Sequence, residues 1–115
     1  MRSKRLDEVF YKELKRLFFK PTCFYFSADA WKGMGIDLSQ DGAVFLLWGG
    51  FIYCDYEDGQ FVIVIKDRYM RFYVLREVYA LAERVFKADI VPKWKQTRDG
   101  IPQFVLRTGY RKKER

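Results

Sequence analysis

The chain has 115 residues and a mass of 13.9 kDa, with 22 basic and 15 acidic side chains and no histidine. A chain of this length forms one domain and can bury a hydrophobic core. Half of its residues are hydrophobic and 19% are aromatic, which excludes intrinsic disorder over most of the chain. The absence of histidine excludes Ser-His-Asp triads, Cys-His dyads, His-ligated zinc and acid–base catalysis by imidazole.

The net charge of +7 is unevenly distributed along the sequence. Residues 1–20 have a net charge of +4, residues 21–65 of −5, and residues 66–115 of +8. This segregation predicts one face that meets a polyanion and another that can hold a cation. If folding intermixes the charges, they form an ordinary solvated surface instead, and the sequence leaves both possibilities open.

The sequence also bears on the cellular compartment. Its longest apolar run, Ala43 to Cys54, has twelve residues and is too short to cross a bilayer. An amphipathic pattern rather than an apolar signal core follows the basic N-terminus, so we expect a cytoplasmic protein without membrane binding. Cys23 and Cys54 are expected to be reduced thiols, although a disulfide between them stays open. The absence of Asn, together with abundant Lys, Arg and Glu, favours a thermophilic source.

The first element expected in chain order is a helix over residues 4–19, with Ser3 as its N-cap and Pro21 after its end. A short strand over residues 22–26 and a glycine-containing connection over residues 27–40 follow. The apolar residues that recur at helical spacing, and therefore predict the buried stripe of the helix, are Leu6, Val9, Phe10, Leu14, Leu17 and Phe18.

Three strands are expected over residues 43–48, 51–57 and 60–66. Gly49-Gly50 and Asp58-Gly59 lie between them, and both dipeptides are typical of two-residue hairpin turns. Gly49-Gly50 could instead be a bulge within one long strand. Residues 62–65 are all β-branched and apolar, which predicts a central strand covered on both faces.

A second helix is expected over residues 67–87, and a final hairpin over residues 93–98 and 101–107. Pro102 predicts an edge position for the last strand. The fold class is therefore α+β, with two helices packed on a mainly antiparallel sheet of five to six strands in the order α-β-β-β-β-α-β-β. We expect one domain over residues 1–108 and a basic tail over residues 109–115. The stripe expected to be buried in the second helix is Phe72, Leu75, Val78, Ala82 and Val85.

Basic residues interleaved with aromatic residues predict nucleic-acid binding. Trp94 stands between two lysines, and on a strand it takes the opposite face from them. We favour a core position for Trp94, the alternative being an edge where bases can stack. The function expected is that of a small basic non-enzymatic protein that contacts DNA or RNA phosphates with little base specificity and needs no cofactor. The expected contact residues are Lys12, Arg16, Lys93, Trp94, Lys95, Arg98, Arg107, Tyr110, Arg111, Lys112 and Lys113.

A second possibility is a protein–protein interaction module, such as a subunit or inhibitor of a larger assembly, or a homo-oligomer. The aromatic content is more than a small core requires, and the surplus could form an exposed patch.

A third possibility follows from the order of helices and strands, which is similar to the core of the PD-(D/E)XK nucleases. That resemblance implies Mg²⁺-dependent phosphodiester hydrolysis, and the candidate metal ligands are Asp41, Asp55 and Glu57. The family carries a carboxylate two residues before its lysine, where this sequence has Val64 before Lys66. Such a site would be degenerate, and no catalytic residue is assigned.

Overall fold

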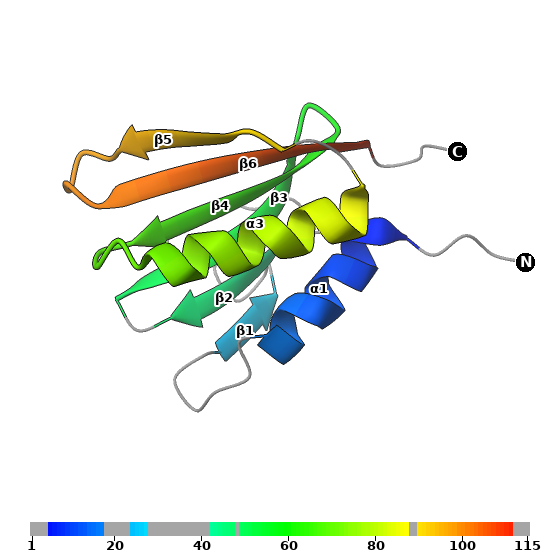
Figure 1. Ribbon diagram of the computed structural model, residues 1–115, viewed down its shortest axis with the longest axis horizontal. Helices are drawn as coiled ribbons and strands as arrows, with labels where there is room; N and C mark the ends of the chain where they lie inside the picture. Colours follow the sequence, from blue (N-terminus) through cyan, green and yellow to red (C-terminus); the bar gives the residue numbers. More distant parts are fainter. Residues whose placement is uncertain (1–4, 18–23, 28–41, 48, 88–89, 112–115) are drawn as a thin grey trace, which may run out of the picture.

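The computed structural model describes residues 5–17, 24–27, 42–47, 49–87 and 90–111. Within these ranges, α1 (Leu6–Leu17) and α3 (Phe72–Phe86) pack on a six-stranded antiparallel sheet (Figure 1). The sheet order is β1-β2-β3-β4-β6-β5, and the chain order confirms the predicted α+β class. The strands are β1 (Phe24–Ser27), β2 (Ala43–Leu47), β3 (Gly50–Glu57), β4 (Gln60–Asp67), β5 (Pro92–Gln96) and β6 (Pro102–Arg111).

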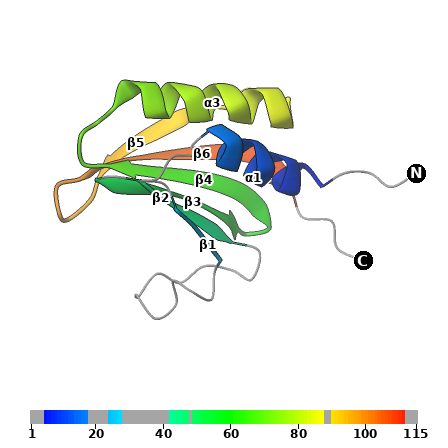
Figure 2. The same ribbon diagram turned by 90° about the horizontal axis from the view of Figure 1, so that it is seen from below.

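Both helices cover the same face of the sheet (Figure 2). Phe10 and Leu14 of α1 and Val78 of α3 are buried against alternate residues of the strands, including Ile52 and Ile63. This alternation follows from the period of two in a strand, which directs every second side chain toward the helices. β4 lies between β3 and β6, and residues 61–65 are all buried, which confirms the central, doubly covered strand.

Many of the aromatic residues form one cluster around Phe61. Its ring centroid lies 6.0 Å from that of Phe10, 5.3 Å from Tyr56 and 5.4 Å from Phe86. The Phe86 ring also lies 5.5 Å from Tyr110 of β6. These are favourable edge and tilted contacts, and they connect both helices to strands β3, β4 and β6.

The start of α1 is fixed to β3 by a buried carboxylate. Asp7 is fully buried, and its Oδ2 accepts hydrogen bonds from the Tyr56 hydroxyl and from Arg5 Nη2, both at 2.6 Å. Its Oδ1 accepts the Glu8 backbone N–H at 2.8 Å. Burial of Tyr56, followed by its bond to Asp7, raises the pKa of the Tyr56 hydroxyl, which therefore stays protonated as a donor.

The final hairpin differs from the prediction at its second strand. β6 extends to Arg111 instead of ending at Arg107, because Thr108 is buried and its hydroxyl donates to the Phe61 carbonyl at 2.8 Å. The predicted edge position of this strand is wrong, since β6 lies between β4 and β5. Pro102 is tolerated there because it is the first residue of β6, where no ladder hydrogen bond is lost.

The second helix begins at Phe72 rather than at residue 67, and its buried face is rotated from the predicted one. Val78 and Ala82 are buried as expected. Phe72 is instead 74% exposed, which corrects its assignment to the core. The first helix spans Leu6–Leu17, and the predicted cap Ser3 lies outside the described residues.

The two ends of the sheet are distinct. At one end lie the β3–β4 turn, the start of α1 and the end of β6. Asp58 and Gly59 form the predicted two-residue turn, and both have positive φ. At the other end lie the β2–β3 and β5–β6 hairpins and the connection from β4 to α3. Neither helix in the described ranges is long and apolar enough to cross a membrane.

We predict that Asp7→Ala lowers the free energy of unfolding by about 3 kcal/mol, because the Tyr56 hydroxyl and Arg5 lose a shared buried partner. Urea denaturation measures this change. The matched control is Glu8→Ala, since Glu8 is exposed and lies 3.5 Å from Arg5. The control should change stability by less than about 0.5 kcal/mol. Equal effects of the two variants would contradict the role assigned to Asp7.

Candidate interaction surface

The connection from β4 to α3 is organised by Asp67, the last residue of β4. Its Oδ1 accepts the Tyr69 backbone N–H at 3.0 Å, and its Oδ2 accepts the Arg71 backbone N–H at 3.0 Å. The Arg71 guanidinium donates to the two carboxylate oxygens at 2.9 and 3.1 Å. Four donors on one side chain hold residues 67–71 in a fixed turn, and α3 begins directly after it.

The electrostatics of this turn follow from its geometry. Burial disfavours the ionised form of Asp67, but bonds from the Arg71 side chain and from the two backbone amides outweigh burial and lower its pKa. Asp67 also raises the pKa of Arg71. The guanidinium carbon of Arg71 lies 5.5 Å from the centroid of the Tyr69 ring, a cation–π contact.

Tyr69 packs against the β2–β3 hairpin. A Cβ placed on Gly49 would lie 2.2 Å from the Tyr69 ring, and Gly49 has a φ of +84°. Only glycine satisfies both conditions, because it has no Cβ and readily adopts positive φ. The Gly49 carbonyl also accepts the Arg68 backbone N–H at 2.9 Å. The hairpin and the turn therefore support each other. Since β3 begins at Gly50, the alternative of a bulge within one long strand is wrong.

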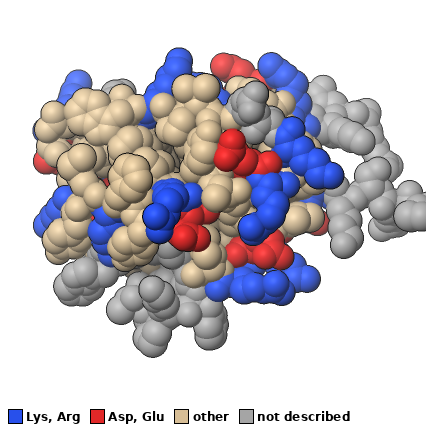
Figure 3. Space-filling model, viewed as in Figure 1, with Lys and Arg blue, Asp and Glu red and all other residues tan. Residues whose placement is uncertain are grey.

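The fixed turn presents large apolar side chains to solvent. Met70, which has a positive φ of 49°, is 58% exposed, and Phe72 is 74% exposed. Uncharged side chains gather on this part of the face shown in Figure 3, whereas charged ones dominate over α1. We name this region the exposed apolar surface, formed by Tyr69, Met70, Phe72, Tyr73 and Trp94.

A small cavity and a neighbouring strand connect Trp94 with the other members of this surface. Phe104, Met70 and Phe72 line a cavity of about 50 Å³ together with Ile65. Phe104 pairs with Trp94 across the β5–β6 ladder, so Trp94 lies on the helix side of the sheet at its edge. Trp94 is 56% exposed, which corrects the expected core position and favours the alternative of an edge.

Among the residues predicted to bind nucleic acid, those that the structure describes do not form one patch. Trp94 of β5 pairs with Phe104 of β6, and Arg111 is the last residue of β6. The seven residues from Phe104 to Arg111 place Trp94 and Arg111 about 23 Å apart along the sheet. Near Trp94 the structure places exposed Lys93 and, in the hairpin turn, exposed Arg98. Lys95 of β5 pairs with Gln103 of β6. Lys12 and Arg16 are exposed on α1, and Lys112 and Lys113 lie outside the described residues.

Several of these predicted residues have protein partners instead. Arg16 lies 3.7 Å from Glu13, and Arg107 lies 3.4 Å from Glu57. The Arg111 guanidinium donates to the Asp58 carbonyl at 3.1 Å. The Tyr110 ring packs on Phe86 in the aromatic cluster.

The two described carboxylates of the nuclease hypothesis, Asp55 and Glu57, are not gathered around Lys66. Glu57 pairs with Arg107, and Asp55 accepts the Tyr56 backbone N–H at 2.8 Å. Lys66 donates to Asp99 at 2.8 Å, and this bond is the main cause that lowers the pKa of Asp99. Asp41 lies outside the described residues, and the residues that are described contain no group of three or more potential metal ligands.

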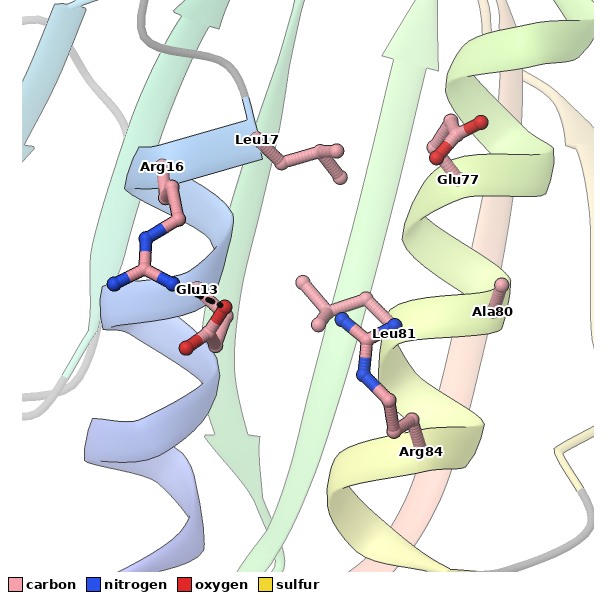
Figure 4. Close-up of a pocket in the computed structure, with 7 residues that line it drawn as sticks. All are labelled: Glu13, Arg16, Leu17, Glu77, Ala80, Leu81 and Arg84. Atoms are coloured by element: carbon pink, nitrogen blue, oxygen red, sulfur yellow. Dashed lines mark ion pairs between the residues drawn. The ribbon is translucent and has the colours of Figure 1, made fainter.

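A larger cavity of about 350 Å³ lies between the two helices (Figure 4). Leu17 of α1 and Leu81 of α3 form its apolar part. The rim carries balanced charges, because it contains Glu13, Arg16, Glu77 and Arg84. A groove with two acidic and two basic residues selects no sign of ligand charge, so the exposed apolar surface is the stronger candidate.

Sequence reasoning missed the role of residues 67–73, although a signal for it is present. Met70, Phe72 and Tyr73 lie close together in sequence, and no single helix face can bury all three. Asp67 precedes them at a position from which an Asp side chain can bond the following backbone amides. This combination indicates a turn with exposed apolar residues.

Comparisons with known proteins add no family to this description. A scan against protein-family models, a search of curated proteins and a search of solved structures each give no match.

The stability of the turn should depend on pH. The pKa of Asp67 is lowered from 3.8, so its carboxylate stabilises the fold above that pH and loses its effect as pH falls through the folded-state value. We expect Asp67→Asn to reduce the free energy of unfolding by about 2 kcal/mol at neutral pH. The difference in free energy of unfolding between wild type and Asp67→Asn, measured by urea denaturation, should become smaller below pH 3.8. Asp58→Asn controls for the loss of one exposed charge, and a gap independent of pH would contradict the prediction.

Gly49 offers a separate test of how Tyr69 is positioned. Alanine at position 49 must adopt a positive φ, which costs about 1–2 kcal/mol, and its Cβ also displaces the Tyr69 ring. Gly100→Ala is the matched control, because Gly100 has a φ of +80° and its Cβ would have its nearest neighbour at 3.9 Å. We expect Gly49→Ala to lower the free energy of unfolding more than Gly100→Ala does. In a double-mutant cycle on the Tyr69→Ala background, Gly49→Ala should cost no more than Gly100→Ala. Equal losses would show that the ring contact is unimportant.

Proposed function

We propose that this protein is a protein–protein interaction module that binds its partner through the exposed apolar surface. The observation that carries the proposal is the display of Met70, Phe72 and Trp94, each more than half exposed, around a small apolar cavity. Large apolar side chains gathered on the surface of a small domain mark interaction sites. Aromatic residues, Met and Arg are the residue types that protein interfaces favour.

The rigidity of the surface supports this proposal. Asp67 receives four hydrogen bonds, and Met70 is held at positive φ. A non-glycine residue in that conformation costs free energy, which the bonds to Asp67 offset. The exposed Met70 side chain adds no packing to the hydrophobic core. A surface held in one conformation loses little entropy on binding, which favours a partner that docks there.

The cations around the surface indicate the charge of the partner. Arg68 is exposed near Phe72, and Lys93 is exposed beside Trp94. Arg76 is also exposed, but it lies 3.9 Å from Glu77 and is therefore partly neutralised. The nearby acidic side chain of Asp67 is already engaged by Arg71. An acidic partner with apolar anchors therefore complements this region in both charge and polarity.

Single-stranded nucleic acid is the second candidate for the same surface. Trp94 is exposed at the sheet edge beside Lys93, and aromatic platforms flanked by cations hold bases and phosphates without sequence preference. The high exposure of Phe72 and Met70 beside an apolar cavity favours the protein partner, because bases and phosphates make no use of such a cavity.

The test compares partner capture by variants that leave the core intact. We expect Phe72→Ala and Trp94→Ala each to reduce recovery of a bound protein about tenfold or more, the size of a typical hot-spot loss. Both should change stability by less than about 0.5 kcal/mol, because the side chains are exposed. Quantitative mass spectrometry of cross-linked complexes from the source cells measures recovery.

The matched control is Val91→Ala, which removes an apolar side chain that is 70% exposed but does not belong to the exposed apolar surface. It should recover the partner like wild type. Equal loss in all three variants, or no loss in any, would contradict the proposal. Fluorescence anisotropy with a labelled oligothymidylate tests the second candidate, which predicts steeply salt-dependent binding that Trp94→Ala weakens.

A further inference from the structure

Within the described ranges, the edge of the sheet beside the exposed apolar surface has backbone groups without a partner. β5 is an edge strand, and in the described part of the chain it pairs only with β6. Gln96 pairs with Pro102, which has no N–H, and the next residue, Thr97, donates to the Ile101 carbonyl at 3.3 Å. The alternation of an antiparallel ladder then directs the backbone groups of Lys93 and Lys95 toward β6, and those of Trp94 and Gln96 outward.

The two faces of β5 differ in chemistry. Trp94 lies on the helix side beside Phe104, which lines the small cavity. Lys93 precedes it on the other face and is exposed, and Arg98 is exposed in the adjoining turn. The nearest carboxylate of that turn, Asp99, is engaged by Lys66. An added strand would therefore meet an aromatic surface on one face and positive charge on the other.

We propose that an extended acidic segment of a partner protein adds to β5 as a seventh strand, which rests on the proposed function and names its partner class. The segment alternates acidic residues, which face Lys93, with apolar residues, which face Trp94 and the cavity. Backbone bonds to Trp94 and Gln96 supply affinity, and the two faces supply selectivity, as in other cases of strand addition.

A second copy of the chain does not fit this edge. Antiparallel pairing of two β5 strands centred on Trp94 would place Lys93 of one copy opposite Lys95 of the other. Like charges directly opposite each other destabilise a strand pair. Lysines on a short edge strand are a common protection against self-pairing. Protection against self-pairing does not explain Trp94, because an exposed indole favours association with other molecules at a sheet edge.

The direct test uses a synthetic peptide of eight residues in which glutamate alternates with valine, with both ends blocked. Hydrogen exchange measured by NMR on the full chain should show at least about tenfold slower exchange at the Trp94 and Gln96 amides. The Lys93 and Lys95 amides, which face β6, should change little. A peptide of the same composition with glutamates and valines in separate blocks should give no such protection, nor should one with lysine in place of glutamate.

Two variants separate strand addition from general stickiness. Gln96→Pro removes an outward N–H while keeping the ladder to β6, and should weaken peptide binding roughly fivefold relative to Gln96→Ala. Lys93→Glu should weaken binding of the glutamate peptide and strengthen binding of the lysine peptide. Absence of peptide binding at millimolar concentration, or binding without protection of Trp94 and Gln96, would overturn strand addition.

The outcomes also separate this inference from the proposed function. If Phe72→Ala and Trp94→Ala lose the cellular partner but Gln96→Pro keeps it, the surface binds a protein by another mode and strand addition is wrong. If the peptide protects the β5 edge while neither surface variant affects capture, the proposed function is wrong for the cellular partner. Displacement of the peptide by a lower concentration of oligothymidylate would instead assign the surface to nucleic acid.

Discussion

The carboxylate of Asp67 determines how one end of this molecule is built. It terminates the central strand β4, bonds the backbone amides of Tyr69 and Arg71, and pairs with the Arg71 guanidinium. These bonds set the point at which α3 begins and the rotation of the helix about its axis. Met70 and Phe72 face solvent as a consequence, while Val74 and Val78 reach the core. One buried acid thereby couples the stability of the fold to the shape of its candidate binding surface.

Asp7 has a comparable role at the opposite end of the sheet. It links the first turn of α1 to Tyr56 of β3, close to the Phe61 aromatic cluster. Both carboxylates are buried, accept backbone N–H groups and pair with an arginine nearby in sequence. Each therefore satisfies the requirement that a buried charge be hydrogen-bonded and paired. The charge segregation seen in the sequence does not reveal these residues, since it counts charges without their partners.

The sequence predicted the elements that depend on local signals. The Asp58-Gly59 turn, the central strand and the order of helices and strands followed from turn chemistry and hydrophobic periodicity. The errors arose where a tertiary contact or a bond from a side chain to the backbone decides the outcome. Thr108 extends β6 because its hydroxyl reaches Phe61, and Phe72 leaves the core because Asp67 starts the helix late. The predicted nucleic-acid contact residues were based on basic composition, and they stay a prediction. The exposed apolar surface was not predicted, because it depends on how Gly49 and Asp67 position Tyr69 and the start of α3.

The opposed ends of the sheet bear on how this domain can be connected to other molecules. α1 begins and β6 ends at the end of the sheet that contains the Asp58 turn, whereas the β4–α3 connection and the β5–β6 hairpin lie at the other end (Figure 1). A tether, fused domain or solid support attached next to Leu6 or Arg111 would therefore begin at the end of the sheet opposite the exposed apolar surface.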